Sequence, residues 1–234
     1  MLWLCITIIA LGALICVFYV REKIKAYSVK SVVIKTVVSL LFVLLAAYCS
    51  FTKGNHPINT FIIFGLVLGL VGDIVLDLKY VYPKDDKIYT YTGFIVFLLG
   101  HIFYIVGMYL EFFNDVSILY LIIPIAVAIV LGFANLFLAK PLKLNYGDLK
   151  LICLFYAMVL FANPLCSLSL LIANGWKSTS LIMMFAGGLL FAASDLVLSG
   201  TYFGEGHERP IDFILNYLTY YGAQYVIAFS IFFL

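Results

Sequence analysis

The sequence predicts an all-α integral membrane protein, a single bundle of eight transmembrane helices. Its composition is the first indication, because 65% of the 234 residues are hydrophobic and only 11% are charged. A soluble globular domain has about 25% charged residues. The second indication is the pattern, since the apolar residues gather in runs of roughly 20, the length that crosses a bilayer. The short segments between these runs leave no room for a soluble domain, so residues 1–234 are expected to form one polytopic domain.

Each apolar run predicts one span, and the segments between them hold most of the Lys, Arg, Pro and Asn. The first run lacks a basic start and a small-residue cleavage pattern, and it is too long for a secretory signal, so it is expected to be a retained anchor. The runs, in order, are roughly 2–20, 31–51, 60–78, 91–111, 117–138, 150–173, 180–200 and 212–234.

Basic residues alternate between the two sides of the predicted bundle. Lys53 and Lys177 follow the second and sixth runs, and no basic residue follows the fourth. The positive-inside rule therefore places both chain termini outside and the other set of connections in the cytoplasm, as in a multi-pass protein of a bacterial inner membrane. This cytoplasmic set comprises Arg21, Lys23, Lys25, Lys30, Lys79, Lys84, Lys87, Lys140, Lys143, Lys150 and Arg209.

The polar residues inside the runs are expected to share the cytoplasmic half of the membrane. Asp77 falls at the interface, and Asp73 lies about 6 Å deeper at 1.5 Å per residue. Asp195 is expected at the depth of Asp73, and Lys35 about one turn in. Such groups cost about 2.5–3.5 kcal/mol each on insertion scales and usually face a cavity or one another. This common depth predicts a single site. Three further polar residues are expected nearer the middle: His101, Asn163 and Gln224.

Two halves of the chain resemble one another. "GLVGDIVLDL" at 69–78 parallels "FAASDLVLSG" at 191–200, and the following runs carry "GHIFYI" and "GAQYVI". This similarity indicates a 4+4 repeat in parallel orientation, as occurs in other membrane folds. Asp73 and Asp195 would then be symmetry-related across a central cleft.

Each candidate residue also has a purely structural interpretation. Asp73 and Asp195 could bridge helices, and Asp77 could be solvated at the interface. His101 could be a hydrogen-bonded packing residue, or a general acid/base or the orienting partner of an aspartate. Lys35 could extend to the headgroups, or pair with a carboxylate or a lipid phosphate. Tyr104, one turn after His101, shares its face of the helix.

Several kinds of site are not expected. There is no G-x-S-x-G and no P-loop, so Ser194 is not predicted to be a nucleophile, and no nucleic-acid partner is indicated. His56 and His207 fall in connections on opposite sides of the membrane, so no metal site and no cofactor is predicted. The five cysteines are interpreted as apolar packing residues: Cys5, Cys16, Cys49, Cys153 and Cys166.

Several short motifs, taken in order along the chain, resemble those of the YhhN family, the bacterial relatives of the TMEM86 lysoplasmalogenases. The resemblance covers about residues 30–234, with Thr36 at a position where the family commonly has Pro. The motifs read Gly72-Asp73, Gly100-His101 with Tyr104, Phe191 with Ser194-Asp195, and Tyr220-Tyr221 with Gln224, preceded by Lys35.

The resemblance implies an eight-helix hydrolase that cleaves the vinyl-ether bond of lysoplasmalogens without a cofactor. Asp73 and Asp195 would divide the roles of proton donor and stabilising anion. His101 and Tyr104 would position water or relay the proton, and Lys35 would hold the substrate phosphate. Supporting roles are expected for Asp77, Asn163, Ser194, Tyr221 and Gln224.

Two other classes fit the same residues. Acids within a membrane also bind protons or sodium, so a proton- or ion-coupled transporter of small molecules or lipids is the main alternative. A non-catalytic lipid-binding scaffold is the third.

Overall fold

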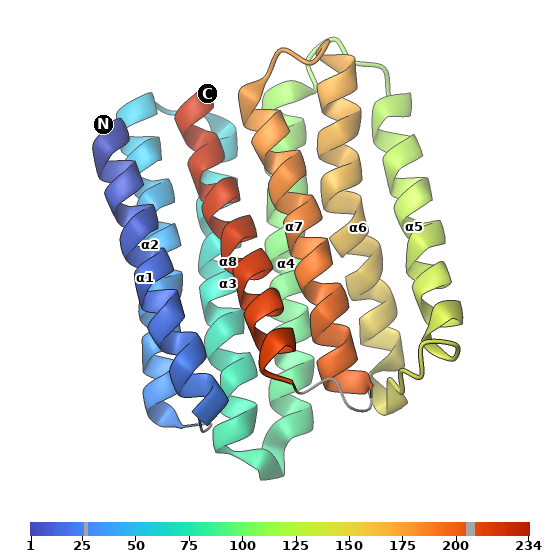
Figure 1. The fold of residues 1–234 in the computed structure, drawn as a ribbon. Helices are drawn as coiled ribbons and strands as arrows, with labels where there is room; N and C mark the ends of the chain where they lie inside the picture. Colours follow the sequence, from blue (N-terminus) through green and yellow to red (C-terminus); the bar gives the residue numbers. More distant parts are fainter. Residues whose placement is uncertain (26–27, 205–208) are drawn as a thin grey trace.

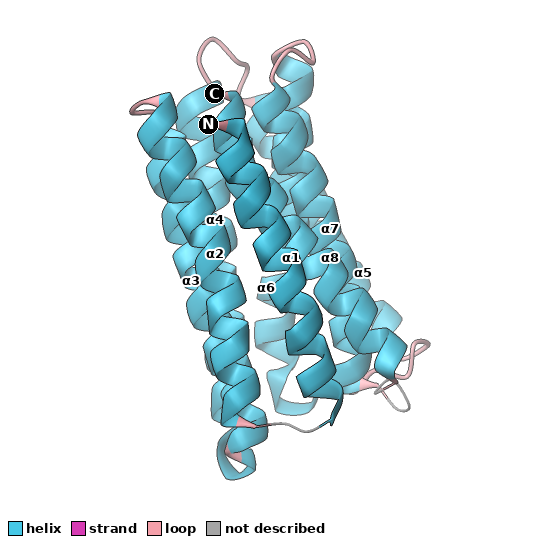
Figure 2. Ribbon diagram, turned by 60° about the vertical axis from the view of Figure 1, so that its left-hand side comes forward, coloured by secondary structure: helices cyan, strands magenta, loops and turns pink. Residues whose placement is uncertain are grey.

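Eight α-helices run side by side along one bundle in the computed structural model, which describes residues 1–25, 28–204 and 209–234 (Figure 1). No strand occurs in these residues (Figure 2). The predicted all-α class is confirmed, and every predicted run overlaps one helix. The helices are α1 (Leu2–Lys25), α2 (Val29–Lys53), α3 (Pro57–Val81), α4 (Asp86–Phe112), α5 (Leu119–Ala139), α6 (Lys150–Ala173), α7 (Thr179–Phe203) and α8 (Pro210–Ser230).

Seven of the described helices, α1 to α7, are long and apolar enough to cross a membrane. The eighth predicted span differs, because α8 buries the polar side chains of Asp212, Asn216 and Gln224. These side chains lower its apolarity below that of a lipid-facing helix. They are accommodated because α8 packs against α1, α2, α3 and α7 within the bundle. Figure 1 shows α8 running beside α7 along the bundle.

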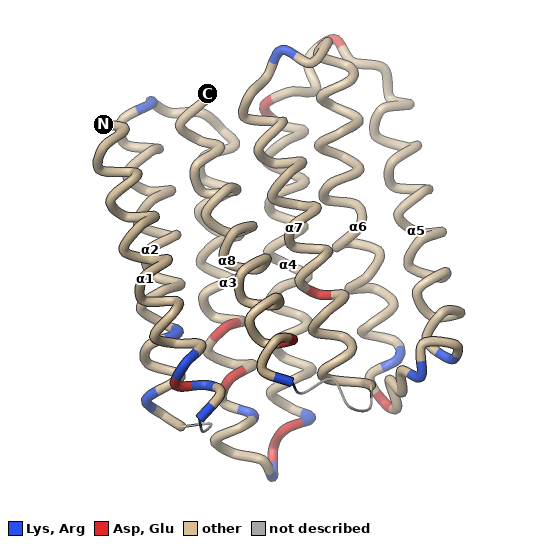
Figure 3. The backbone as a smooth tube through the Cα atoms, viewed as in Figure 1, with Lys and Arg blue, Asp and Glu red and all other residues tan. Residues whose placement is uncertain are grey.

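The two ends of the bundle differ in charge. Both chain termini lie at one end (Figure 1). Most of the Lys and Arg residues gather at the other end, which is called the basic end below (Figure 3). The helices α1, α3, α5 and α7 finish there, and α2, α4, α6 and α8 begin there. Most of the basic residues predicted in the connections at this end instead lie within the helices, near their ends: Arg21, Lys23, Lys25, Lys30, Lys79, Lys87 and Lys150. Lys23 is only 3% exposed.

Local sequence signals determine where several helices begin. Ser28 caps α2, since its hydroxyl accepts a hydrogen bond from the Ser31 backbone and its own N–H donates to the Ser31 hydroxyl. Ser178 caps α7 in the same manner through the backbone N–H of Leu181. Proline opens α3 and α8, where its fixed φ and missing N–H are both tolerated. These starts set the register in which the later turns present their polar side chains.

Glycines allow α3 and α4 to approach closely. A Cβ at Gly65 would lie 2.3 Å from the Tyr104 ring and 2.9 Å from the carbonyl oxygen of Gly100. A Cβ at Gly72 would lie 2.6 Å from the Phe97 ring. Small residues at such contacts are a common means of packing membrane helices, because they bring the backbones together. The contact fixes the rotation of α3, and hence the direction in which its acids point.

A Gly65→Ala variant is expected to lower the free energy of unfolding by about 1–3 kcal/mol, because the added methyl group must displace a ring and a backbone carbonyl. Gly222→Ala on α8 is the matched control, since its Cβ would meet only Leu190, at 3.8 Å. Relief of backbone entropy should leave that variant unchanged or more stable, by up to about 1 kcal/mol. Unfolding in detergent, followed by circular dichroism, compares the two. Equal stability of both variants would contradict the close α3–α4 contact.

Candidate functional site

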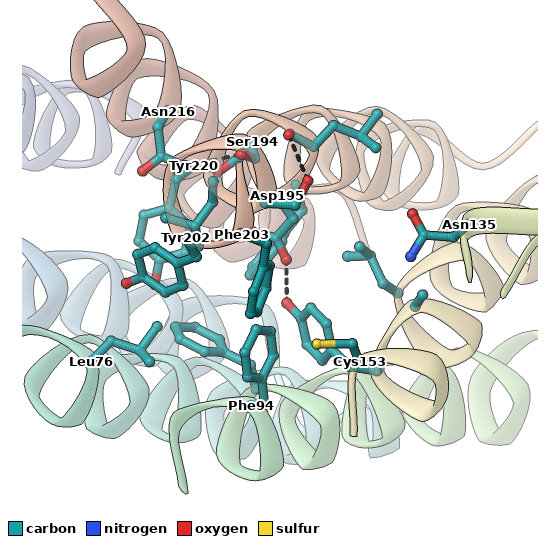
Figure 4. Close-up of a pocket in the computed structure, with 18 of the residues that line it drawn as sticks. Leu76, Phe94, Asn135, Cys153, Ser194, Asp195, Tyr202, Phe203, Asn216 and Tyr220 are labelled. Carbon is teal, nitrogen blue, oxygen red and sulfur yellow. Dashed lines mark hydrogen bonds between the residues drawn. The ribbon is translucent and has the colours of Figure 1, made fainter. Parts of the chain in front are cut away.

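An open cavity of about 890 Å³ lies in the basic-end half of the bundle and is lined by residues of α2 to α8. Both predicted acids line it, Asp73 from α3 and Asp195 from α7. Figure 4 shows Asp195 and Ser194 on one side of the cavity, and Phe94 and Cys153 on the other. Most of the remaining wall is apolar or aromatic, and includes Leu76, Phe97, Leu160, Phe161, Phe191, Leu196, Leu198 and Phe203.

Asp73 is enclosed by donors from two other helices. Its Oδ2 accepts hydrogen bonds from the hydroxyl groups of Ser39 at 2.5 Å and Tyr220 at 2.8 Å. Its Oδ1 lies 3.2 Å from the ammonium nitrogen of Lys35. Both carboxylate oxygens therefore have partners, although Asp73 is 2% exposed.

Asp77 is buried rather than solvated at the interface. Its carboxylate accepts hydrogen bonds from Tyr19 at 2.8 Å, Lys23 at 2.8 Å and Lys35 at 3.2 Å. Lys35 thus lies between Asp73 and Asp77, with side chains almost fully buried on all three. These contacts are those of a lysine paired with carboxylates, the second of the interpretations that the sequence allowed.

Asp195 has fewer partners. It is half-buried, and its Oδ2 accepts a hydrogen bond from the hydroxyl of Tyr156 on α6. Its neighbour Ser194 accepts hydrogen bonds from the Asn216 amide at both its hydroxyl and its carbonyl oxygen. Ser194 therefore joins α7 to α8 and holds the turn that carries Asp195.

A chain of hydrogen bonds extends from Asp73 away from the cavity. Tyr220 donates to Asp73, the Gln224 amide donates to the Tyr220 hydroxyl at 3.0 Å, and Tyr104 donates to Gln224 Oε1 at 3.1 Å. Tyr221 lies beside this chain, with its hydroxyl 3.4 Å from that of Ser39. Three of the predicted residues, Tyr104, Tyr221 and Gln224, are therefore connected to Asp73 without lining the cavity.

His101 and Asn163 form a separate buried pair. The Nδ2 atom of Asn163 lies 3.1 Å from Nδ1 of His101. The imidazole packs against the rings of Phe191 and Tyr156, both of which line the cavity, and His101 itself does not. The structure thus places His101 behind the wall, where it can orient Tyr156 and Phe191.

Several residues of the site, Asn216 among them, were not singled out from the sequence. Ser39 could have been found one turn after Lys35 on the same helical face, and Tyr156 two turns before Asn163. Tyr19 and Lys23 share a face of α1, but nothing in that helix alone indicates that it faces an acid.

Metal ligands do not cluster in the part of the chain that the structure describes. His207, predicted in a connection, lies outside the described residues. The cysteines that the structure describes are all unpaired, and Cys5 and Cys49 are in contact, with sulfur atoms 3.7 Å apart.

This fold and site define a class: a multi-pass, all-α membrane protein with two carboxyl groups at one open cavity. No curated protein and no solved structure matches the chain. The chain belongs to the YhhN family, whose family model matches residues 30–231. The resemblance of the motifs is therefore confirmed over most of the sequence.

Proposed function

We propose that this protein hydrolyses the vinyl-ether bond of lysoplasmalogens, releasing a fatty aldehyde and a glycerophospho-base. The observation that carries the proposal is that Asp73 and Asp195, from different helices, line one mostly apolar cavity. Carboxyl groups in different surroundings can divide acid and electrostatic roles. Membership of the YhhN family supports the same activity.

The cavity suits a lipid with one chain. Most of its wall is apolar or aromatic, as in sites that hold an acyl or alkenyl chain, and a few polar groups converge on it. Leu196, which lines it, is 56% exposed on α7, so the cavity reaches the surface that faces lipid. A lysophospholipid could enter sideways from the bilayer, with its chain among the aromatic residues and its ether beside the acids.

The chemistry requires a proton donor, an anion and water. Protonation of the β-carbon of the vinyl ether gives an oxocarbenium ion, to which water adds, and the resulting hemiacetal collapses to aldehyde and alcohol. General acid catalysis contributes about 10²–10⁴-fold. Lys35 and Tyr220 hold the Asp73 carboxylate in place, and His101 supports the wall from behind.

The proposed orientation places the basic end in the cytoplasm of a bacterial cell and both termini outside. A parallel 4+4 repeat is also proposed. It is supported by an equivalence between the halves, since the second helix of each half donates a hydrogen bond to the acid on the third. Ser39 on α2 donates to Asp73, and Tyr156 on α6 donates to Asp195. The contacts of α4 with α6 and of α8 with α2 are equivalent under the same relation.

Mass spectrometry of the purified protein, incubated with a panel of lysolipids in detergent micelles, tests the proposal. We expect aldehyde release from alkenyl lysolipids, no hydrolysis of acyl or alkyl analogues, and no release above background when Asp73 and Asp195 are both Asn. An active variant without both carboxyl groups would refute the site.

The same purified protein can be used to distinguish a transporter from an enzyme. A carrier moves its substrate only across a sealed membrane under a gradient, whereas an enzyme turns over in micelles. Transport into vesicles with no aldehyde in micelles would replace the hydrolase with a carrier.

A further inference from the structure

The charged residues beside the cavity form a balanced group. The Lys35 ammonium lies 3.2 Å from Asp73 and 3.2 Å from Asp77, and the Lys23 ammonium lies 2.8 Å from Asp77. All four side chains are almost fully buried. Two ammonium groups thus neutralise two carboxylates, and buried charges persist when they are paired in this manner.

Asp73 has the contacts of an ionised carboxylate. It receives hydrogen bonds from Ser39 and Tyr220 on one oxygen and faces an ammonium group on the other. An ionised carboxylate only accepts hydrogen bonds, and those it accepts are stronger than hydrogen bonds between neutral groups. A proton on Asp73 would compete with one of these donors, so the surroundings hold Asp73 as the anion.

The described residues provide no counter-ion for Asp195. Among the described residues it receives one hydrogen bond, from Tyr156, and no basic nitrogen lies within 4.0 Å of it. Lys79 lies at the same end of the bundle, with its ammonium over the Tyr202 ring, 3.1 Å from the centroid. Around Asp195 the wall is mostly apolar, and Asp73 lines the same cavity.

An ionised Asp195 would be an uncompensated charge in a mostly apolar site, repelled by the Asp73 anion. A half-buried carboxyl group in mostly apolar surroundings, without a counter-ion among the described residues, lowers this cost by keeping the proton. Tyr156 donates to Oδ2, so the proton belongs on Oδ1, which has no hydrogen-bond partner among the described residues.

We infer that Asp195 is the general acid and Asp73 the anion that stabilises the cation. The inference rests on the proposed vinyl-ether hydrolysis and adds which carboxyl group does which part. It assigns different roles to two residues that have similar sequence contexts but unequal surroundings.

The reaction balances with these two groups and water. Asp195 gives its proton to the β-carbon, the π electrons form the new C–H bond, and the ether carbon becomes an oxocarbenium ion beside Asp73. Water adds to that carbon and loses a proton to Asp195, which restores the acid. The hemiacetal hydroxyl proton then passes to the glycerol oxygen as the C–O bond breaks, leaving aldehyde and alcohol.

Infrared spectroscopy of the purified protein at neutral pH tests the protonation directly, through the carbonyl stretch of a protonated carboxyl group and its shift in D₂O. We expect this band in the wild type and in Asp73→Asn, and its loss in Asp195→Asn. Asp148→Asn is the matched control, because that side chain is 83% exposed and should leave the band unchanged. No band in the wild type, or a band lost only in Asp73→Asn, would overturn the inference.

Aldehyde release provides the second measurement. Asp195→Asn should lower the rate by about 10²–10⁴-fold, the usual contribution of a general acid. Asp195→Glu, which keeps an acidic proton, should recover part of it, and full activity of Asp195→Asn would overturn the inference. The infrared bands test the protonation of the two aspartates, and aldehyde release tests the proposed hydrolysis. If the expected bands appeared but no lysolipid was cleaved, the assigned protonation states would stand and the proposed hydrolase would be rejected.

Discussion

A Lys35→Met variant is expected to lose about 3–5 kcal/mol of unfolding free energy, the usual cost of removing one partner from a buried ion pair. Lys35 is 5% exposed and is the only cation at ion-pair distance from Asp73 among the described residues. Its removal leaves Asp73 as a buried charge that only hydroxyl groups stabilise. Thermal or denaturant unfolding in detergent measures the loss of stability. The rate of aldehyde release should also fall, because Lys35 no longer pairs with the Asp73 anion.

Lys30→Met on the same helix is the matched control. Lys30 also pairs with an acid, Glu22 at 2.9 Å, but its side chain is 69% exposed. Exposed ion pairs contribute about 0.2–1 kcal/mol, so this variant should be close to the wild type. Adding Asp73→Asn to Lys35→Met should restore part of the stability, because the uncompensated charge is then absent. Equal losses for the two lysines would contradict the buried pairing.

A Tyr220→Phe variant is expected to lower the rate of aldehyde release about 10–100-fold with little change in fold. The Tyr220 hydroxyl donates to Asp73 at 2.8 Å and accepts from Gln224 at 3.0 Å, so it joins the Asp73 carboxylate to the hydrogen-bond chain that ends at Tyr104. Hydrogen bonds to charged groups are worth about 1.5–3 kcal/mol, and each 1.36 kcal/mol lost from the transition state is tenfold in rate. Steady-state kinetics on an alkenyl lysolipid measure the effect, with kcat and KM reported separately.

Tyr225→Phe is the control for this change. Tyr225 lies on the same helix and is also buried, but its hydroxyl donates to the backbone oxygen of Val38 and to neither acid. It should cost about 0.5–1.5 kcal/mol of stability and leave kcat unaltered. If both variants lowered kcat equally, the effect would belong to the packing of α8 and not to Asp73.

The lengths of the apolar runs predicted the helices well, because hydrophobicity acts through the local sequence. The predicted run 150–173 and α6 have the same bounds. The prediction was weakest at α8, where Asn216 and Gln224 reduce the apolarity of a helix that other helices cover. A helix that is shielded from lipid can carry such residues, and its own sequence does not reveal what will cover it.

In the site, too, one part was predictable from the sequence and another part depended on how the helices pack. That Asp73 and Asp195 lie in the same half of the bundle follows from their places along α3 and α7, since helical rise converts residue number into distance along the helix. Their partners depend on the rotation and packing of neighbouring helices, which glycines such as Gly65 adjust through contacts remote in sequence. The packing of the helices therefore placed Lys35 between two carboxylates and His101 behind the cavity wall. It gave Asp195 a tyrosine as its hydrogen-bond partner. Depth is a property of a single helix, whereas a hydrogen bond between helices needs both of them in place.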